Sequence, residues 1–423
     1  MTFVTIELLV IAALWGWWAW KDPKRAYLGL PILLPTYVVR GSLGPIPTTG
    51  LELILIATLV AWTLKRGKSG VRETWTALRP WRGPALLWLA AGLVAVIVSP
   101  VHLQALGLYR AYFIEPLLIF FVGADLVRTL DDQRKLAQGF ATITILLSIW
   151  AAIQMLTGWG IPHPWDAVPG RRAVGPFSFP NALALFVTPI AALAFADRLQ
   201  KKEDRLLNIE FGWATVISGL VAIILAQSDG GLIAFAAAAF IALVLNKRTW
   251  KIAVGLAALS LIAFLAIAPL RTRVIEMVTF QEWSGKVRTV MWSETWTMLR
   301  DRPVFGAGLA AYPTVILPYH KATWMEVFQY PHNIVLNLWS ETGLLGLMAF
   351  AFIIFIWVRG PWSVAERTAD RKPQTALLLI LPVVVAILVH GLVDVPYFKN
   401  DLAIAFWMLI LLTMSTHRPA QKT

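Results

Sequence analysis

Residues 331–357, PHNIVLNLWSETGLLGLMAFAFIIFIW, decide the fold class of this chain. A helix needs about 20 predominantly apolar residues to cross the hydrocarbon core of a bilayer, and this run supplies them. His332, Asn333 and Asn337 stand at one end of the run. Glu341 lies about 13 Å deeper, at about 1.5 Å per helical residue. Because ionisable groups are costly inside a membrane, the run predicts a spanning helix with functional side chains near its mouth.

Apolar runs of similar length fill the rest of the chain, which has 423 residues and is 58% hydrophobic and 14% charged. They predict an all-α, polytopic transmembrane helical bundle of about 12–13 spans, which forms a single membrane domain over residues 1–423. The long hydrophilic connection over residues 270–330 is expected to form a small helical cap. The remaining runs lie near residues 3–20, 27–40, 50–64, 84–99, 111–127, 136–157, 178–197, 207–227, 230–246, 250–269, 374–393 and 401–415.

The basic residues predict the orientation of these spans. Twenty-five of the 37 Lys and Arg residues fall in one set of alternate connections, whereas the short connections of the opposite side hold five. Under the positive-inside rule the basic set is cytoplasmic, and the N-terminus and the 270–330 loop lie outside. The arginines that oppose this bias are explained either by an anionic ligand or by lipid headgroups and local carboxylates. They are Arg40, Arg110, Arg171, Arg172 and Arg288.

The composition argues against several other classes of function. The chain contains no cysteine, which excludes disulfides, thiolate nucleophiles and Cys-ligated metals. Topology explains the net charge of +13, so no nucleic-acid partner is expected. The His and carboxylate residues lack HxxxH or HxxE spacing, so neither a metal nor another cofactor is expected. The first run lacks the basic start and the cleavage site of a signal peptide, and we expect it to be a retained span.

Two outward segments carry candidate anion-binding residues. Arg171 and Arg172 come shortly before a helix that starts at Asn181. A helix N-terminus with two guanidinium groups beside it makes a phosphate cradle, and the alternative is a purely structural loop. The sequence AQSDGG at residues 226–231 predicts an outward turn between two spans. Asp229 in this turn either pairs with an Arg of the same face or is simply a polar turn residue.

The long outward loop carries further candidates. Its helical spacing places Arg288, Trp292 and Thr295 on one face of a helix. The Trp residues of this loop either stack on sugar rings or lie on the membrane surface. Candidates that reach the same outer boundary from neighbouring spans are His332, His390 and Asp394.

In this order the motifs resemble those of the O-antigen ligase and polymerase-like membrane glycosyltransferases of bacteria. The resemblance covers residues 170–410. Its motifs are Arg172 followed by GPFSFPNALA, the turn SDGG, Arg288 with Trp292 followed by RPVFGAG, the stretch HNIVLNLWSETGLLG, and HGLVD. The resemblance implies a GT-C-like bundle in the bacterial cytoplasmic membrane, with a lateral cavity and an active site on the extracytoplasmic side.

The resemblance also implies the substrates. Such enzymes take glycan from an undecaprenyl-diphosphate-linked oligosaccharide or polysaccharide and pass it to a glycan, lipid or protein acceptor. The diphosphate-binding arginines of the family correspond to Arg172, or Arg171, and to Arg288. The essential loop histidine corresponds to His332. Many members carry Arg in the turn where this chain has Asp229, so one cationic contact is absent or comes from elsewhere.

The residues fit a single inverting displacement that needs no metal. Fixed arginines stabilise the negative charge that develops on a diphosphate leaving group, and a histidine takes the proton of the incoming hydroxyl. We expect His332 to be the base, with Glu341, Asp394 or His390 as its partner, and the residues expected to bind sugar or acceptor are Asn333, Trp292, His390 and Asp229. Ligase and polymerase share this machinery. The alternatives are a lipid-linked glycan transporter or flippase and a non-catalytic assembly component.

Overall fold

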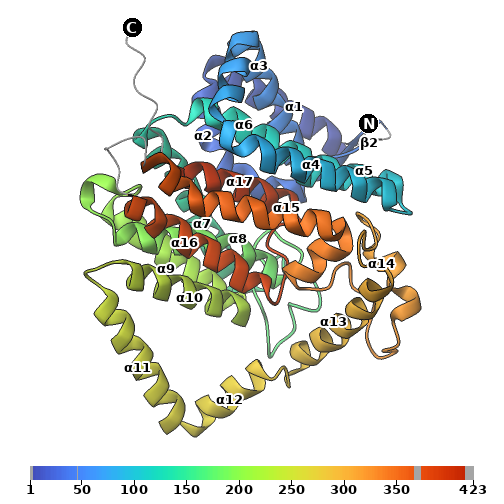
Figure 1. Cartoon of the computed structure of the whole chain (residues 1–423), viewed down its shortest axis with the longest axis vertical. Coiled ribbons are helices and arrows are strands. Elements are labelled where there is room, and N and C mark those ends of the chain that lie inside the picture. Colours follow the sequence, from blue (N-terminus) through green and yellow to red (C-terminus); the bar gives the residue numbers. More distant parts are fainter. Residues whose placement is uncertain (1–2, 45, 366–372, 415–423) are drawn as a thin grey trace.

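The computed structural model describes residues 3–44, 46–365 and 373–414, and Figure 1 shows the whole chain. The described residues are almost entirely helical, with one two-stranded hairpin. Basic residues that we expect on the cytoplasmic side but that lie outside the described residues are Arg367, Arg371, Lys372, Arg418 and Lys422.

The N-terminal part of the chain is helical around this hairpin. Its elements are α1 (Phe3–Lys21), α2 (Pro23–Leu33), η1 (Leu34–Val38), β1 (Arg40–Leu43), β2 (Ile46–Thr49), α3 (Gly50–Ala77), α4 (Arg79–Val98), α5 (His102–Tyr109), the π-helical turn η2 (Arg110–Ile114), α6 (Glu115–Leu126) and α7 (Leu130–Thr157). The predicted span over residues 27–40 is wrong in its second half. Pro35 has no N–H to continue the helix, so the chain tightens into η1 and then enters the hairpin, where Arg40 lies opposite Thr49.

The C-terminal part contains the segments that carry the candidate residues. Its elements are α8 (Pro180–Arg198), η3 (Lys202–Asp204), α9 (Ile209–Leu225), α10 (Asp229–Leu245), α11 (Trp250–Ala266), α12 (Ala268–Val278), α13 (Trp283–Asp301), α14 (Tyr312–Val315), η4 (Leu317–Tyr319), α15 (Ile334–Ala365), α16 (Pro373–Gly391) and α17 (Asn400–Thr413). In the bundle, α8 packs against α9, α10 and α16, and α15 packs against α4 and α16.

The last helix, α17, lies in the core of the bundle. Every residue from Asp401 to Thr413 is buried, as expected for a helix that is apolar on all its faces. Aromatic side chains fix the loop before it, because the hydroxyl of Tyr397 accepts from the indole N–H groups of Trp88 and Trp407 at 3.2 and 3.1 Å. The same hydroxyl donates to the carbonyl of Tyr112 at 2.8 Å. This buried anchor places the α16–α17 loop at one end of the bundle.

The prediction of an all-α polytopic bundle is confirmed, whereas the predicted number of spans is not reached. Among the described helices, five are long and apolar enough to cross a membrane: Arg79–Val98, His102–Leu126, Leu130–Thr157, Pro180–Arg198 and Ile334–Gly360. A sixth is possible by composition if α11 and the helices after it count as one span, although they bend by 102°. Other predicted runs fall on shorter apolar helices, such as α9, α10 and α17. The GT-C-like arrangement and the lateral cavity stay predictions.

The connection over residues 270–330 is largely helical, but it does not form a compact cap. Its helices α12 and α13 form an arch together with α11. Figure 1 shows α11 and α12 leaving the bundle as a wide V, and α13 leading back to it. None of the side chains of α12 is buried. Helix α13 is packed, and at its far end Met298 and Leu299 bury against Tyr312 and Ile316. The predicted helix around Arg288 is confirmed as part of α13.

Gly343 allows the loop that follows α13 to lie against α15. Its φ of 66° is in the left-handed region, and an added Cβ would lie 2.4 Å from the carbonyl oxygen of Val304. We therefore predict that Gly343→Ala lowers the free energy of unfolding by about 1–3 kcal/mol. Thermal unfolding of the purified protein in detergent measures this change.

The matched control for this substitution is Gly255→Ala in α11. An added Cβ at Gly255 meets no atom within 4 Å, so this substitution should change stability by less than about 0.5 kcal/mol. Equal unfolding temperatures for the Gly343 and Gly255 variants would contradict the steric explanation.

Candidate functional site

The loop that joins α7 to α8 separates the two neighbouring arginines. Arg171 turns back toward α7 and donates through Nη1 to the carbonyl of Met155 at 3.1 Å. Arg172 points the other way and donates to the carbonyls of Ala226 at 2.9 Å and Gln227 at 3.2 Å, in the turn before α10. Of the two arginines, Arg172 is therefore the one that contacts the turn before α10.

Arg172 begins a chain of hydrogen bonds across one end of the bundle. Its Nη2 donates to Oδ1 of Asn181 at 3.3 Å, and Nδ2 of Asn181 donates to Oδ2 of Asp394 at 3.0 Å. The other carboxylate oxygen of Asp394 lies 3.2 Å from Nδ1 of His332. The structure thus joins three of the predicted site residues through a residue that the sequence did not single out. The available signal was an amide in the first turn of a helix directly beside an arginine loop.

Asp394 is a fully buried carboxylate in the loop between α16 and α17. Burial acts to raise the pKa of this carboxyl, but the charge and hydrogen bond of His332, together with His390 and Lys399 nearby, hold the pKa below its usual range. The backbone N–H of Val395 also donates to it at 2.8 Å. Asp394 is consequently ionised at neutral pH and can orient the imidazole of His332.

His332 lies two residues before α15 and keeps one side of its ring open. Its φ of 44° is in the left-handed region, where a residue with a side chain is uncommon and often functional. Its side chain is 22% exposed, and the ring of Tyr330 lies 4.6 Å away. The next residue, Asn333, caps α15, because its side-chain Oδ1 accepts from the N–H groups of Val335 and Leu336.

Two side chains of α13 donate hydrogen bonds to the backbone next to Asp394 and next to His332. Arg288 donates through Nε to the carbonyl of Val393 at 3.0 Å, one residue before Asp394. One helical turn later, the indole N–H of Trp292 donates to the carbonyl of Pro331 at 2.8 Å, one residue before His332. The face predicted for this helix therefore fixes the two backbones that carry the pair.

Glu341 is buried away from this group. Its Oε2 accepts from the N–H of Ala310 at 2.6 Å, and Ala310 has a left-handed φ of 63°. Among the described residues, neither a hydrogen bond nor an ion pair joins Glu341 to His332. The structure does not bring these two predicted partners together, and the contact of Glu341 instead fixes the loop after α13 on α15.

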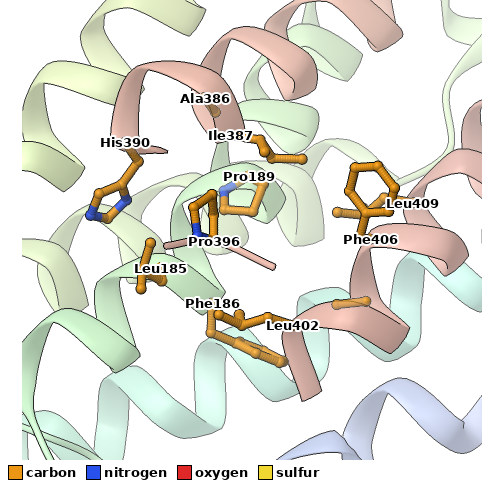
Figure 2. Close-up of a pocket in the computed structure, with 11 residues that line it drawn as sticks. Leu185, Phe186, Pro189, Ala386, Ile387, His390, Pro396, Leu402, Phe406 and Leu409 are labelled. Atoms are coloured by element: carbon orange, nitrogen blue, oxygen red, sulfur yellow. The ribbon is translucent and has the colours of Figure 1, made fainter. Parts of the chain in front are cut away.

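His390 is also inside the bundle rather than at its surface. It is 2% exposed, and within the described part of the chain neither ring nitrogen has a hydrogen-bond partner. Figure 2 shows its ring among apolar side chains that line a small pocket, such as Leu185 of α8 and Pro396 of the loop between α16 and α17. His390 lies close to Asp394 along the chain, and the backbone N–H of Asp394 donates to the backbone carbonyl of His390 at 3.1 Å. This position does not favour direct contact with sugar.

Two further basic residues, Lys399 and Arg110, are held by contacts within the protein. Lys399 was not predicted as a site residue, yet its ammonium lies 3.6 Å above the ring of Phe179 at the start of α8. Burial lowers the pKa of Lys399 to about 8, against the opposing effect of Asp401 and Asp394. Arg110 has ordinary partners instead of a ligand, as Glu52 lies 2.7 Å and Glu115 lies 3.2 Å from its guanidinium.

Asp229 has an arginine partner on the same face. Nη2 of Arg273, from α12, lies 3.3 Å from its Oδ2. Ser228 caps α10, and the side chain of Asp229 is 47% exposed. Within the described residues, no group of three or more His, Cys, Asp and Glu side chains is arranged to hold a metal ion.

A family model described as O-antigen ligase matches residues 214–351, about a third of the chain. The matched stretch runs from α9 into α15 and includes Asp229, Arg288 and His332. A search of curated proteins found no match. The family match confirms the resemblance seen in the sequence motifs. Together with the apolar helices, it identifies a multi-pass membrane protein with a ligase- or polymerase-type function in glycan handling.

The contact of Glu341 generates a prediction that separates support from catalysis. Glu341→Ala leaves the buried N–H of Ala310 without an acceptor, and should lower the free energy of unfolding by about 1–3 kcal/mol. Glu341→Gln keeps a carbonyl oxygen in place and should cost less. Thermal unfolding of both variants measures the difference. Normal stability of Glu341→Gln combined with complete loss of glycan transfer would instead assign a catalytic role to the carboxylate.

Proposed function

We propose that this chain, whose residues 214–351 match the O-antigen ligase family, is a membrane glycosyltransferase. It takes glycan from an undecaprenyl-diphosphate-linked donor on the outer face of the bacterial cytoplasmic membrane, and its acceptor is a glycan, a lipid or a protein. The observation that supports this function best is the chain of hydrogen bonds from Arg172 through Asn181 and Asp394 to His332. It joins a group suited to bind phosphate with a group suited to accept a proton.

In the proposed reaction, His332 acts as the general base. Asp394 occupies Nδ1 of the imidazole, which leaves Nε2 to accept the proton of the acceptor hydroxyl. As the proton leaves, the hydroxyl oxygen attacks the anomeric carbon of the donor sugar. The carboxylate of Asp394 stabilises the imidazolium that forms, in the way that buried carboxylates support catalytic histidines elsewhere.

The arginines act on the leaving group. The bond between the anomeric carbon and the phosphate oxygen breaks, and its electron pair remains on undecaprenyl diphosphate. Arg172 and Arg288 stabilise the developing negative charge, because guanidinium groups bind phosphate oxygens in a bidentate manner and lose little energy to reorganisation when held in place. A single displacement of this kind inverts the anomeric configuration. Ligation and polymerisation share the step and differ in the acceptor.

The predicted contacts to sugar and acceptor take a more indirect form. Trp292 and Asn333 use their polar groups on backbone carbonyls, of Pro331 and Leu392 respectively. We propose that both shape the floor on which the acceptor hydroxyl meets His332. Asn333 is exposed enough to touch substrate, since the hydrogen bond from its side-chain amide to the carbonyl of Leu392 lies at the surface.

His332→Ala tests the base. It should lower the rate of glycan transfer by about 10²-fold or more, because a positioned base contributes about 10²–10⁴-fold, while binding of the lipid-linked donor persists. His163→Ala is the matched control, since His163 is 85% exposed in the α7–α8 loop and should leave transfer unchanged. The measurement uses purified protein with undecaprenyl-diphosphate-linked glycan and scores products by chain length. Full transfer activity of His332→Ala would overturn the assignment of the base to His332, whereas no transfer by the unmodified protein would favour a transporter or an assembly component.

Asp394→Asn tests the positioning of the base. The amide retains the shape of the carboxylate but cannot stabilise an imidazolium, so kcat should fall by about 10²-fold or more. The KM for the donor should change by less than about twofold, because Asp394 does not touch the diphosphate in this mechanism. A loss confined to KM would assign Asp394 to donor binding instead.

A further inference from the structure

The turn before α10, residues 226–230, meets arginines from separate segments of the chain. Arg172, from the α7–α8 loop, donates to two backbone carbonyls of the turn at 2.9 and 3.2 Å. Arg273, from α12, reaches the carboxylate of Asp229 in the same turn at 3.3 Å. The arch and the α7–α8 loop thus bring a guanidinium group to the same few residues from two directions.

Arg288 approaches this turn through its contact with the α16–α17 loop. It donates to the carbonyl of Val393, and the side chain of Val393 lies against Gly230. An added Cβ on Gly230 would come within 2.7 Å of Cγ2 of Val393, which leaves no room between the two segments. Burial chiefly, with Arg288 nearby, lowers the pKa of the Arg172 guanidinium, whereas Asp229 acts to raise it. The charged groups of the turn are therefore close enough to affect one another.

Stability does not account for the position of Arg273. Helix α12 buries none of its side chains, and the side chains of Arg273 and Asp229 are 56% and 47% exposed. Exposed ion pairs contribute little to folding. The second carboxylate near Arg273, that of Glu282, is less exposed but lies farther away, at 3.7 Å. A guanidinium held this weakly can exchange a carboxylate for a phosphate group, to which it binds in a bidentate manner.

We propose that Arg273 is a third cation of the donor site, which Asp229 holds beside the turn until the diphosphate of the lipid-linked donor binds. The inference rests on the proposed function. Three guanidinium groups then face the diphosphate, against the two carboxylates of Asp229 and Glu282. Asp229, which departs from the family pattern, places a cation at the turn instead of removing one from the site.

The test compares Arg273→Gln with Arg271→Gln in the purified full-length protein. Both substitutions remove one positive charge from α12, but Arg271 donates to the carbonyl of Leu265 at the end of α11 and does not face the turn. Undecaprenyl diphosphate and undecaprenyl monophosphate serve as probes in equilibrium binding measurements at fixed ionic strength. Arg172→Gln is the reference for a cation that the proposed function already requires.

We expect Arg273→Gln to raise the Kd of undecaprenyl diphosphate by about tenfold, the effect of losing one charge-assisted contact, and Arg271→Gln by less than about twofold. The loss should be smaller for undecaprenyl monophosphate, which offers fewer oxygens to a third cation. Equal affinities of the Arg273 and Arg271 variants, with weaker binding by Arg172→Gln, would overturn this inference and leave the proposed function standing. Failure of the unmodified protein to bind either probe would overturn both.

Discussion

The buried carboxylate of Asp394 is the charge around which one end of the bundle is organised. An ionised carboxylate without water is tolerated only when its oxygens are fully hydrogen-bonded, and here they receive the amide of Asn181, the N–H of Val395 and the imidazole of His332. These contacts come from α8, from the loop of Asp394 itself and from the start of α15. Satisfying one carboxylate therefore fixes the relative positions of three segments that are distant in the sequence.

Helix α13 adds a second level of restraint from outside the bundle. Arg288 and Trp292 bind the carbonyls that immediately precede Asp394 and His332, so the spacing of one helical turn sets the distance between the two backbones. The helix belongs to an arch whose middle part, α12, has no buried side chain. The two contacts come from one helix, so the segment between α11 and α15 takes part in shaping the site.

The helices were predictable because hydropathy acts locally, whereas the contacts of the site were not. The face of Arg288 and Trp292 follows from helical periodicity alone and was correctly predicted. The pairing of His332 with Asp394 spans 62 positions, and the sequence named Asp394 only as one of three possible partners, because no local pattern encodes a contact at this separation. A carboxylate inside a span indicates function by default, and the sequence did not reveal that Glu341 accepts a hydrogen bond from a backbone N–H.

Asn181 lies between Arg172 and Asp394 and keeps these two opposite charges from forming a direct ion pair. If Arg172 paired directly with Asp394, each charge would neutralise the other, and neither a diphosphate nor an imidazolium would gain from it. The neutral amide accepts from the guanidinium on one side and donates to the carboxylate on the other. The other hydrogen bonds of Arg172 go to backbone carbonyls, which carry no net charge. An amide spacer thus keeps a cation and an anion in one chain of hydrogen bonds while each retains its charge, which the proposed reaction requires.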